Sequence, residues 1–533
     1  MRHAALYPGI FIISIILSLS GCMKVGPDFV RPDSSVSSDW LDAGDGRITN
    51  HPADYRMWWR AFNDPVLDRL IDTAYRQNLS LRIAGVRVLE ARAQLGVSVG
   101  GIYPQTQEAF GSYNYERVSQ AGLFSGSLVD PRYQQAELGL TAAWELDFWG
   151  KLRRGVQSAD ASWVATMADY DNALVTLTGD VANSYVAIRT LEKRIDVARQ
   201  NVETQVENLR IAQVRFDVGT TTQRDLEQAK TLLNDTKAAI PTLQSQLRQA
   251  KNALSVLLGA PPEHLKELLG GPSDIPAPPP QVAVGIPADL IRRRPDIRSA
   301  EFQAAAQSAR IGVAKADLFP AFTLSGTFGF LSTNIRGVKM ADIFRWDSRE
   351  YTAGPSFSWN ILNYGRITGN VRVQDARFQQ LLIAYQNTVL QAQQEVEDAL
   401  SRFLRAEERA RFLAESAAAA GRSLDLARAQ YREGTVDFTV VLVAQQALLT
   451  EQDNLATTLG SIASGMVAVY RALGGGWQIR EGMDFVPDDV KEVMAKRTNW
   501  GRLLDPAVYI PAEARSGIPE SREDKSLIRL PDW

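Results

Sequence analysis

Residues 135–151 read QAELGLTAAWELDFWGK, and residues 351–366 read YTAGPSFSWNILNYGR. In both stretches apolar side chains alternate with polar or small ones, which is the two-residue period of a β-strand with one apolar face. Each stretch ends in aromatic residues followed by a glycine. A strand of this kind suits a wall between lipid and water, and a half-buried sheet of a soluble protein has the same pattern.

Two further stretches, 109–115 and 322–330, show the same alternation, the first of them more weakly. The chain therefore has four candidate strands. Four strands cannot close a membrane barrel, because the smallest such barrels have about eight. If these strands cross a membrane, several chains must share one barrel.

The body of the chain contains an internal sequence repeat. Three short motifs recur at an offset of 215 residues: Trp144–Lys151 as Trp359–Arg366, Phe216–Thr220 as Tyr431–Thr435, and Leu258–Gly259 as Leu473–Gly474. Upstream of them the offset is 216, so that Asn78–Arg82 faces Arg294–Arg298 and Pro104 faces Pro320. Each half has one order: a helix (about 78–100 and 294–317), two strands, a very long helix, a glycine turn and a shorter helix.

This pattern predicts six segments. They are a cleaved signal peptide (1–21), an N-terminal segment (22–77), a first repeat (78–269), a proline-rich linker (270–293), a second repeat (294–477) and a C-terminal tail (478–533). The tail is longer than this plan needs.

The helix predicted after each glycine is exceptionally long. From Leu152 to Phe216, 18 steps between apolar positions cover 64 residues, about 3.6 residues per step. At about 1.5 Å per residue this is a rod of roughly 100 Å, which must lie along other rods. The following helix has a heptad seam from Leu226 to Leu257. Gly219 and Gly434 separate long from short helix, and predict helical hairpins whose tips point away from the strands.

The N-terminus has the features of a secretory signal. Arg2 and His3 precede an apolar run, and Leu19-Ser20-Gly21-Cys22 follows it. This ending resembles the lipobox of bacterial lipoproteins, which implies a covalent lipid on Cys22; the alternative is an ordinary signal peptide with an incidental cysteine. Met23 after the cysteine favours the outer membrane. No later stretch has 18 unbroken apolar residues.

Composition argues against an enzyme. Cys22 is the single cysteine, which excludes a disulfide within one chain, and there are three histidines. We find no glycine-rich phosphate loop, no His-x-x-x-His and no nucleophile elbow. The net charge of −3 does not suggest a nucleic-acid partner. We therefore expect no catalytic residues, no metal site and no cofactor.

Three motifs, together with the duplication, resemble a known family. They are Cys22–Phe29 (CMKVGPDF), Trp58–Pro65 (WWRAFNDP) and Arg293–Ile297 (RRPDI). The chain resembles the TolC-type outer-membrane factors, and most closely their lipoprotein branch of OprM-like and NodT-like efflux proteins. The resemblance implies a mainly α fold with membrane β-structure. In it, a homotrimer forms one twelve-stranded β-barrel, four strands per chain, continued by a long periplasmic α-helical barrel. Residues 22–77 would then be a lipidated N-terminal segment with an equatorial collar, and the sequence leaves open whether the C-terminal tail wraps that collar or stays disordered.

The same resemblance implies a function. The chain would be the outer-membrane exit duct of a tripartite efflux pump, conducting small molecules such as drugs passively. Its partners would be two other copies of itself, a periplasmic adaptor, an inner-membrane transporter and outer-membrane lipid. The alternatives are an exit duct for type I protein secretion and a lipid-anchored periplasmic coiled-coil scaffold.

The resemblance also assigns candidate site residues at the hairpin tips. A periplasmic gate falls on Asp225, Asp437, Val440 and Val443; the family pattern has aspartates where this chain has the two valines. A trimer would turn each acid into a ring that favours cations. The adaptor-docking turns fall on Val218, Gly219, Thr220, Glu433, Gly434 and Thr435. The alternatives are solvated acids near a helix start and purely structural turns.

Overall fold

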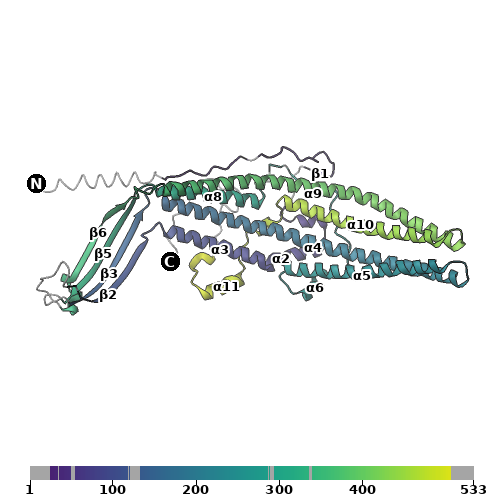
Figure 1. The fold of residues 1–533 in the computed structure, drawn as a ribbon, viewed down its shortest axis with the longest axis horizontal. Coiled ribbons are helices and arrows are strands. Elements are labelled where there is room, and N and C mark those ends of the chain that lie inside the picture. The colour runs from purple at the N-terminus through teal and green to yellow at the C-terminus, as the bar shows by residue number, and fades with distance from the viewer. Residues whose placement is uncertain are drawn as a thin grey trace.

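The computed structural model describes residues 24–33, 35–49, 55–117, 119, 132–285, 287–288, 293–334 and 339–505. They form an elongated body, with a four-stranded sheet at one end and two helical hairpins running away from it (Figure 1). Cys22 and the expected signal peptide lie outside the described residues. Among the described helices, none is both long and apolar enough to cross a membrane.

The order of the main elements is the one predicted from the sequence. The first half contains α3 (Leu79–Gly100), β2 (Thr106–Arg117), β3 (Arg132–Leu146), α4 (Lys151–Asp217) and α5 (Gln223–Leu257). The second half contains α8 (Pro295–Ala316), β5 (Ala321–Thr333), β6 (Arg349–Ser358), α9 (Arg366–Glu433) and α10 (Phe438–Ala472). Two short 3-10 helices, η4 (Met340–Phe344) and η5 (Trp346–Ser348), lie between β5 and β6.

The strands end earlier than the alternation predicts. β3 ends at Leu146 and not at Phe148, and β6 ends at Ser358 and not at Ile361. The reason is visible after β3, where the Asp147 carboxylate accepts the main-chain N–H groups of Leu152 and Arg153, both at 2.9 Å. These bonds satisfy donors at the start of α4 and turn the chain from strand to helix.

The sheet is antiparallel throughout, in the order β2-β3-β5-β6. Its register aligns Leu140 with Phe328 on one face and Thr141 with Thr327 on the other. The apolar face is open: Leu138, Leu140 and Phe328 are 44%, 61% and 43% exposed, with no described part of the chain covering them. A soluble sheet buries this face, so the exposure is the reverse of the soluble pattern.

Pro355 lies in β6, which is an edge strand within the chain and pairs Pro355 with Leu324 of β5. A proline has no ladder donor, and this is the edge position that such a residue favours.

The two long helices carry the length of the molecule. α4 has 67 residues and α9 has 68, so each is roughly 100 Å long at about 1.5 Å per residue. Both begin after a glycine in the left-handed conformation, Gly150 (φ 75°) and Gly365 (φ 81°). α4 folds back into α5 and α9 into α10, each of the returning helices having 35 residues (Figure 1). The predicted hairpins are confirmed.

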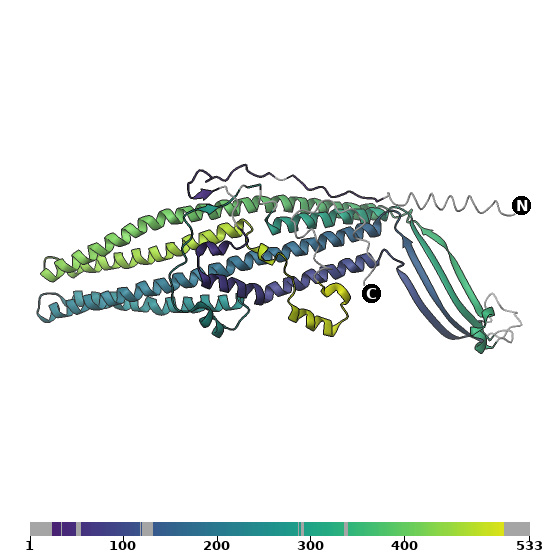
Figure 2. The same ribbon diagram turned by 180° about the vertical axis from the view of Figure 1, so that it is seen from behind.

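The N-terminal segment, residues 24–33 and 35–49, runs along the outside of the helices from the sheet end toward the middle of the molecule (Figure 2). The guanidinium of Arg31 holds it to Glu301 through bonds of 2.7 and 2.6 Å. Its end, β1 (Ile48–Thr49), pairs in parallel with β4 (Val282–Ala283), which lies in the predicted linker. The N-terminal segment and the linker therefore meet at the same level of the helices.

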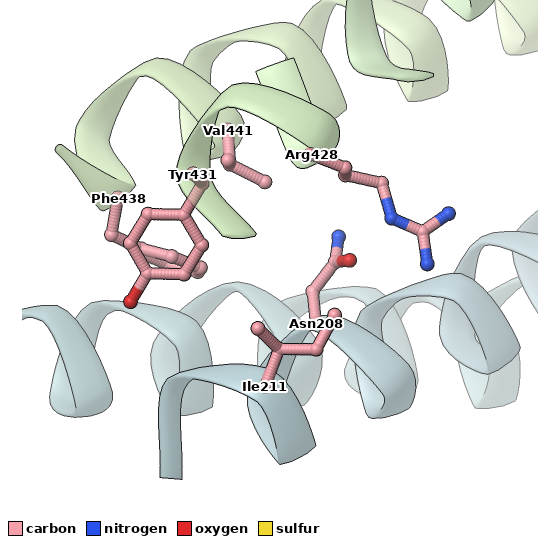
Figure 3. Close-up of a pocket in the computed structure, with 6 residues that line it drawn as sticks. All are labelled: Asn208, Ile211, Arg428, Tyr431, Phe438 and Val441. Atoms are coloured by element: carbon pink, nitrogen blue, oxygen red, sulfur yellow. The ribbon is translucent and has the colours of Figure 1, made fainter. Parts of the chain in front are cut away.

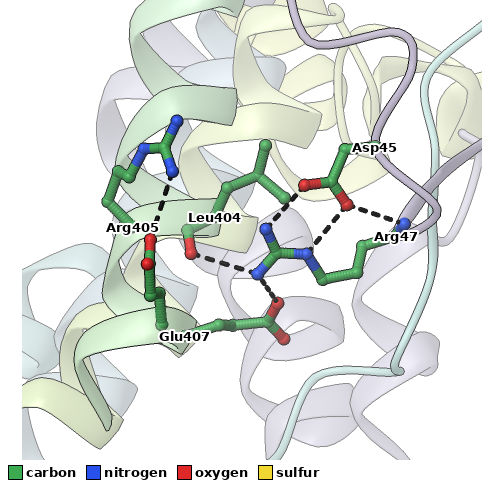
Figure 4. A network of polar contacts seen from close by, with 6 residues as sticks. Asp45, Arg47, Leu404, Arg405 and Glu407 are labelled. Carbon is green, nitrogen blue, oxygen red and sulfur yellow. Dashed lines mark hydrogen bonds and ion pairs between the residues drawn. The ribbon is translucent and has the colours of Figure 1, made fainter. Parts of the chain in front are cut away.

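An arginine fastens this level to α9. Arg47 binds Asp45 at 2.6 Å, and its guanidinium also donates to the Leu404 carbonyl and to Glu407, both at 3.1 Å (Figure 4). The hydrogen bonds from Arg47 hold the pKa of Asp45 at about 2. Four further short elements are η1 (Trp58–Phe62), α2 (Pro65–Gln77), η2 (Pro262–His264) and α6 (Leu265–Leu269).

The C-terminal segment is described as far as residue 505. It contains η6 (Trp477–Arg480), α11 (Asp488–Arg497) and η7 (Gly501–Leu504). Arg480 enters the helical body and forms a two-pronged pair with Asp171 of α4, one prong at 2.8 Å, with both side chains buried. The ring of Phe485 packs edge-on against Tyr170, 4.9 Å between centroids. The first part of the tail thus packs against α4.

Replacing Arg480 by alanine is expected to lower the free energy of unfolding by about 3–5 kcal/mol, because it leaves the Asp171 carboxylate buried without its main charged partner. Urea unfolding of the detergent-solubilised protein, followed by circular dichroism, measures the change. The matched control is Arg471→Ala, which breaks an ion pair with Asp180 whose two side chains are 43% and 41% exposed. That variant should lose less than about 1 kcal/mol. Equal losses of unfolding free energy in the two variants would contradict the prediction that the buried pair of Arg480 with Asp171 stabilises the fold.

Candidate functional site

The two hairpin turns lie side by side at the end of the molecule farthest from the sheet (Figure 1). They are built alike. Thr220 donates its N–H and its hydroxyl to the carbonyl of Arg215, at 2.8 and 3.0 Å, and Thr435 makes both bonds to Gln430, at 3.0 Å each. The predicted turn residues are all exposed there: Val218, Gly219, Thr220, Glu433, Gly434 and Thr435.

Gly219 (φ 72°) and Gly434 (φ 79°) have the left-handed backbone conformation that ends a helix, as the sequence predicts. At these two positions a side chain would be strained, so the tight reversal at each tip depends on glycine.

Asp225 points into the first tip and not toward solvent. It is 5% exposed and forms a capping box with Thr222 at the start of α5. The Thr221 hydroxyl donates to its carboxylate at 2.7 Å. Burial raises the pKa of Asp225, but the hydrogen bonds from Thr221 and Thr222 together outweigh burial and leave it below its ordinary value. The carboxylate is therefore ionised and engaged, which excludes the reading of Asp225 as a freely solvated acid.

Asp437, Val440 and Val443 share a different location. Asp437 is exposed and precedes α10, where its side chain makes no capping bond. Val440 and Val443 follow on the same side of α10 and are 45% and 59% exposed. The structure thus brings three of the four predicted gate residues together on one open face, and places Asp225 elsewhere.

Arg215 joins the two tips. From the last turn of α4, its guanidinium donates to the carbonyl of Tyr431, near the end of α9, and to that of Arg432 at 3.3 Å. It also lies 4.7 Å from the centre of the Tyr431 ring. A cation at a helix C-terminus is favourable because the last carbonyls carry partial negative charge. The Tyr431 hydroxyl adds a bond of 3.3 Å to Thr221. We call these contacts the tip bridge.

Beneath the tip bridge, a small apolar cluster packs the hairpins together. Tyr431 meets Phe438 edge-on at 5.3 Å between ring centres, and both are buried with Val441 against Ala212 of α4. Figure 3 shows Asn208 and Ile211 of α4 facing Tyr431, Phe438 and Val441 across the gap. Side chains fill this recess and leave no room for a water molecule, so it is a packing contact and not a ligand site.

A stripe of polar side chains on α4 faces the second hairpin at intervals of seven residues, and we call it the inter-hairpin seam. Arg194 makes a two-pronged pair with Asp453 at 2.7 and 3.0 Å. The next contacts are Asn201 with Gln452 at 2.8 Å and Asn208 with Gln445 at 2.9 Å, and Arg215 of the tip bridge ends the series. Sequence reasoning counted only apolar positions on this helix and missed the stripe, although its heptad spacing could have revealed it.

The inter-hairpin seam is incompletely bonded. Among the described residues, the side-chain oxygens of Asn201 and Asn208 and the side-chain nitrogen of Gln445 are buried without a hydrogen-bond partner. Such groups weaken an interface relative to an apolar one, because they lose their hydrogen bonds to water and gain none within the protein.

A double-mutant cycle tests the seam. Asn208→Leu alone is expected to destabilise the protein by about 1–3 kcal/mol, because it leaves buried Gln445 without its partner. Asn208→Leu combined with Gln445→Leu is expected to recover or exceed the native thermal unfolding temperature, because both polar groups are then gone. Additive losses in the double variant would show that the pair is not a unit.

The residues at the hairpin tips make structural contacts between the two hairpins. In the parts of the chain that the structure describes, no group of three or more His, Cys, Asp or Glu side chains could hold a metal ion. What the tips offer are exposed turns, a bridge between two hairpins, and an open face with one acid and two valines.

Comparisons with known proteins agree with this architecture. The profile of the family described as outer membrane efflux protein matches residues 70–260 and 286–475. The chain is 31% identical over 481 residues to the pyoverdine export outer membrane protein OpmQ of Pseudomonas putida, covering 90% of this chain and 98% of that protein. It is 30% identical over 466 residues to nodulation protein T of Rhizobium leguminosarum bv. viciae, covering 86% and 92%.

A solved structure points the same way. The outer-membrane channel OprN superposes with a TM-score of 0.80 at 33% sequence identity, covering 85% of this chain and 99% of that one. The family profile takes in most of both halves of the chain. The sequence resemblance and the fold therefore lead to one assignment: the chain belongs to the outer membrane efflux protein family.

Proposed function

We propose that this chain is the exit duct of a tripartite efflux pump and conducts small molecules passively across the outer membrane. One observation carries the proposal: a sheet whose apolar face is uncovered continues directly into two coiled hairpins roughly 100 Å long. The apolar face suits lipid contact, and the hairpins suit the wall of a periplasmic tunnel. OpmQ is named for pyoverdine export, and for this chain too the proposed cargo is a small molecule.

The proposed assembly is a homotrimer with one twelve-stranded barrel. Its support is that β2 and β6 are the outer strands of the sheet within one chain, so each offers an edge to a strand of another copy. Four strands are too few to close a membrane barrel, and three copies supply twelve. In this assembly the rows containing Thr141 and Thr327 face the lumen, and those containing Leu140 and Phe328 face lipid.

The proposed gate lies at the hairpin tips. Asp437, Val440 and Val443 line it, because they share the open face of α10, and the tip bridge with Asp225 holds the hairpins in the closed arrangement. The exposed turns around Gly219 and Gly434 are the proposed docking surface for the periplasmic adaptor, which joins the duct to an inner-membrane transporter. The duct itself performs no catalysis and takes no cofactor.

The proposed anchor is a lipid on Cys22. Its support is the position of the next residues: Lys24 lies against Gly150 at the junction of sheet and helices, and Arg154 donates to the carbonyls of Val25 and Gly26 at 3.1 and 2.9 Å. The junction marks the proposed inner edge of the membrane. A lipid two residues before Lys24 would reach that edge, which suits a lipid-anchored protein of the outer membrane that extends into the periplasm.

Single-channel recording in planar bilayers tests the proposal. The native protein should give small, cation-selective openings. Asp437→Ala should reduce the selectivity without widening the channel, because it removes a charge from the open face. Asp225→Ala should widen it, because the cap and its link through Thr221 to Tyr431 are lost. A native protein that never conducts, and is soluble and elongated once its lipid is removed, would support a coiled-coil scaffold instead.

A further inference from the structure

Each half of the chain has the same tryptophan contact at the junction of sheet and helices. In the first half, the indole N–H of Trp144 donates to the carbonyl of Ile102 at 2.9 Å. In the second half, Trp359 donates to Leu318 at 3.0 Å. Trp359 lies 215 residues after Trp144, and Leu318 lies 216 after Ile102, which are the offsets of the sequence repeat. The turns 102–104 and 318–320 are therefore structurally equivalent.

A second contact joins the first half to the second. The ring of Trp149 stacks on Phe319, with centroids 4.6 Å apart and planes at 23°. Its indole N–H also donates to the carbonyl of Pro320 at 2.8 Å. A residue just before the first long helix thus docks on the turn that precedes the second pair of strands.

The equivalent of Trp149 in the second half is Tyr364, and it has no such turn to meet. Tyr364 is 95% exposed and has a φ of 50°, a left-handed conformation that is uncommon for residues other than glycine. Beside it, Ile361 and Leu362 are 73% and 83% exposed. The apolar patch of Ile361, Leu362 and Tyr364 is therefore held outward at the end of β6.

The turn that would complete the pattern lies at the other edge of the same chain. By the repeat, the counterpart of Phe319 and Pro320 is Tyr103 and Pro104, which precede β2. β2 and β6 are the opposite outer strands of the sheet. Tyr364 and the turn 102–104 therefore cannot meet within one chain, but they can meet between two copies.

We infer that Tyr364 docks on the turn 102–104 of a partner subunit, as Trp149 docks on the turn 318–320 within the chain. The phenol hydroxyl then takes the place of the indole N–H as the donor to the Pro104 carbonyl. The inference rests on the proposed function, and it names the contact that closes the ring of copies. The occupant of the patch is a second copy of this chain, because the chain itself contains the template of the contact.

The helices beside this junction also have a contact that is formed between the halves, while its repeat equivalent is not formed within the chain. Between the halves, α4 meets α8 through Lys151 with Asp317 at 2.7 Å and through Ser299 with Asp169 at 2.5 Å. The repeat equivalents of these helices are α9 and α3. At the positions of Asp169 and Ser299 they carry Ala384 and Ile83. Ile83 and Ile383, the neighbour of Ala384, are 55% and 56% exposed. A second copy that brings Tyr364 to the turn 102–104 also covers these residues.

Cysteine cross-linking tests the contact in the full chain in detergent. Tyr364→Cys with Tyr103→Cys in one chain, treated with a short bismaleimide, should give covalent dimers and trimers, and neither single variant should. Co-expressing the two single variants should give dimers only, because the contact is directional. A double variant that is trimeric by mass yet never cross-links overturns the inference and leaves the proposed function standing. A monomeric protein that does not conduct overturns both.

Substitution at Tyr364 provides a second readout that does not depend on the cross-linker. Tyr364→Ala should lower the temperature at which the trimer dissociates on a semi-native gel, and Tyr364→Trp should keep it, because tryptophan is the residue of the intrachain template. Phe344→Ala is the control, since Phe344 is 74% exposed in η4 at the far end of the sheet. An unchanged Tyr364→Ala trimer would show that Tyr364 faces lipid and not a second copy.

Discussion

Arg215→Ala is expected to raise the single-channel conductance of the reconstituted protein several-fold. Arg215 carries most of the tip bridge, through its bonds to the carbonyls of Tyr431 and Arg432 and its contact with the Tyr431 ring. A hydrogen bond to a charged group contributes about 1.5–3 kcal/mol. Since about 1.4 kcal/mol changes an equilibrium tenfold, its loss should shift each copy by at least about tenfold toward separated tips.

The matched control is Arg210→Ala. Arg210 lies in the same helix, and its replacement removes the same charge. Among the described residues Arg210 binds only Glu207, one turn away, at 2.8 Å. The conductance of the Arg210→Ala variant should remain that of the native protein. The conductance of Tyr431→Phe should lie between those of Arg210→Ala and Arg215→Ala, because it removes only the hydroxyl that contacts Thr221. If Arg215→Ala conducts no better than Arg210→Ala, the tip bridge does not hold the channel closed.

Leu140→Arg is expected to prevent stable insertion into the outer membrane. Leu140 lies within β3 on the apolar face of the sheet and is 61% exposed. An arginine on the lipid face of a membrane barrel costs about 2–4 kcal/mol at the midplane, and a trimer would bear that cost three times. The measurement is the fraction of protein that folds into phosphatidylcholine vesicles, read from heat-modifiable migration on a gel.

Thr141→Arg is the control for this prediction, because the adjacent residue in a strand points to the opposite face. It should insert like the native protein and move the selectivity of the channel toward anions, since three new positive charges would line the lumen. Equal loss of insertion in both variants would overturn the assignment of the two faces. Normal insertion of Leu140→Arg would show that this sheet does not lie in lipid.

Local pattern was sufficient to predict the elements. The alternation around Leu138 and Leu140 predicts β3, and the 3.6-residue spacing after Leu152 predicts α4 over its whole length. Gly219 and Gly434 mark the two hairpin tips at the correct residues. These features depend on neighbours a few residues away, so one sequence contains them. The strand ends were less predictable, because Asp147 turns the chain through bonds that the alternation does not encode.

The candidate site was predicted only in part. The turn residues and the position of Val440 and Val443 beside Asp437 follow from helical spacing. The orientation of Asp225 does not, because it depends on Thr221 and Thr222 closing over the carboxylate. The tip bridge could not be predicted either, since Arg215 and Tyr431 are 216 residues apart and the sequence contains no signal that pairs them.

The sequence by itself determined the repeated order of helices and strands, the alternating faces of the sheet and the glycine tips, because hydrophobic periodicity and glycine backbone freedom act locally. Only the tertiary structure decided which residues meet across the halves, such as Asp171 with Arg480, Asn208 with Gln445 and Trp149 with Phe319. These contacts join residues that are distant in the chain. The pair of Asn208 with Gln445 forms because two helices packed along their length bring every seventh residue of one against the other, a register that no single segment specifies.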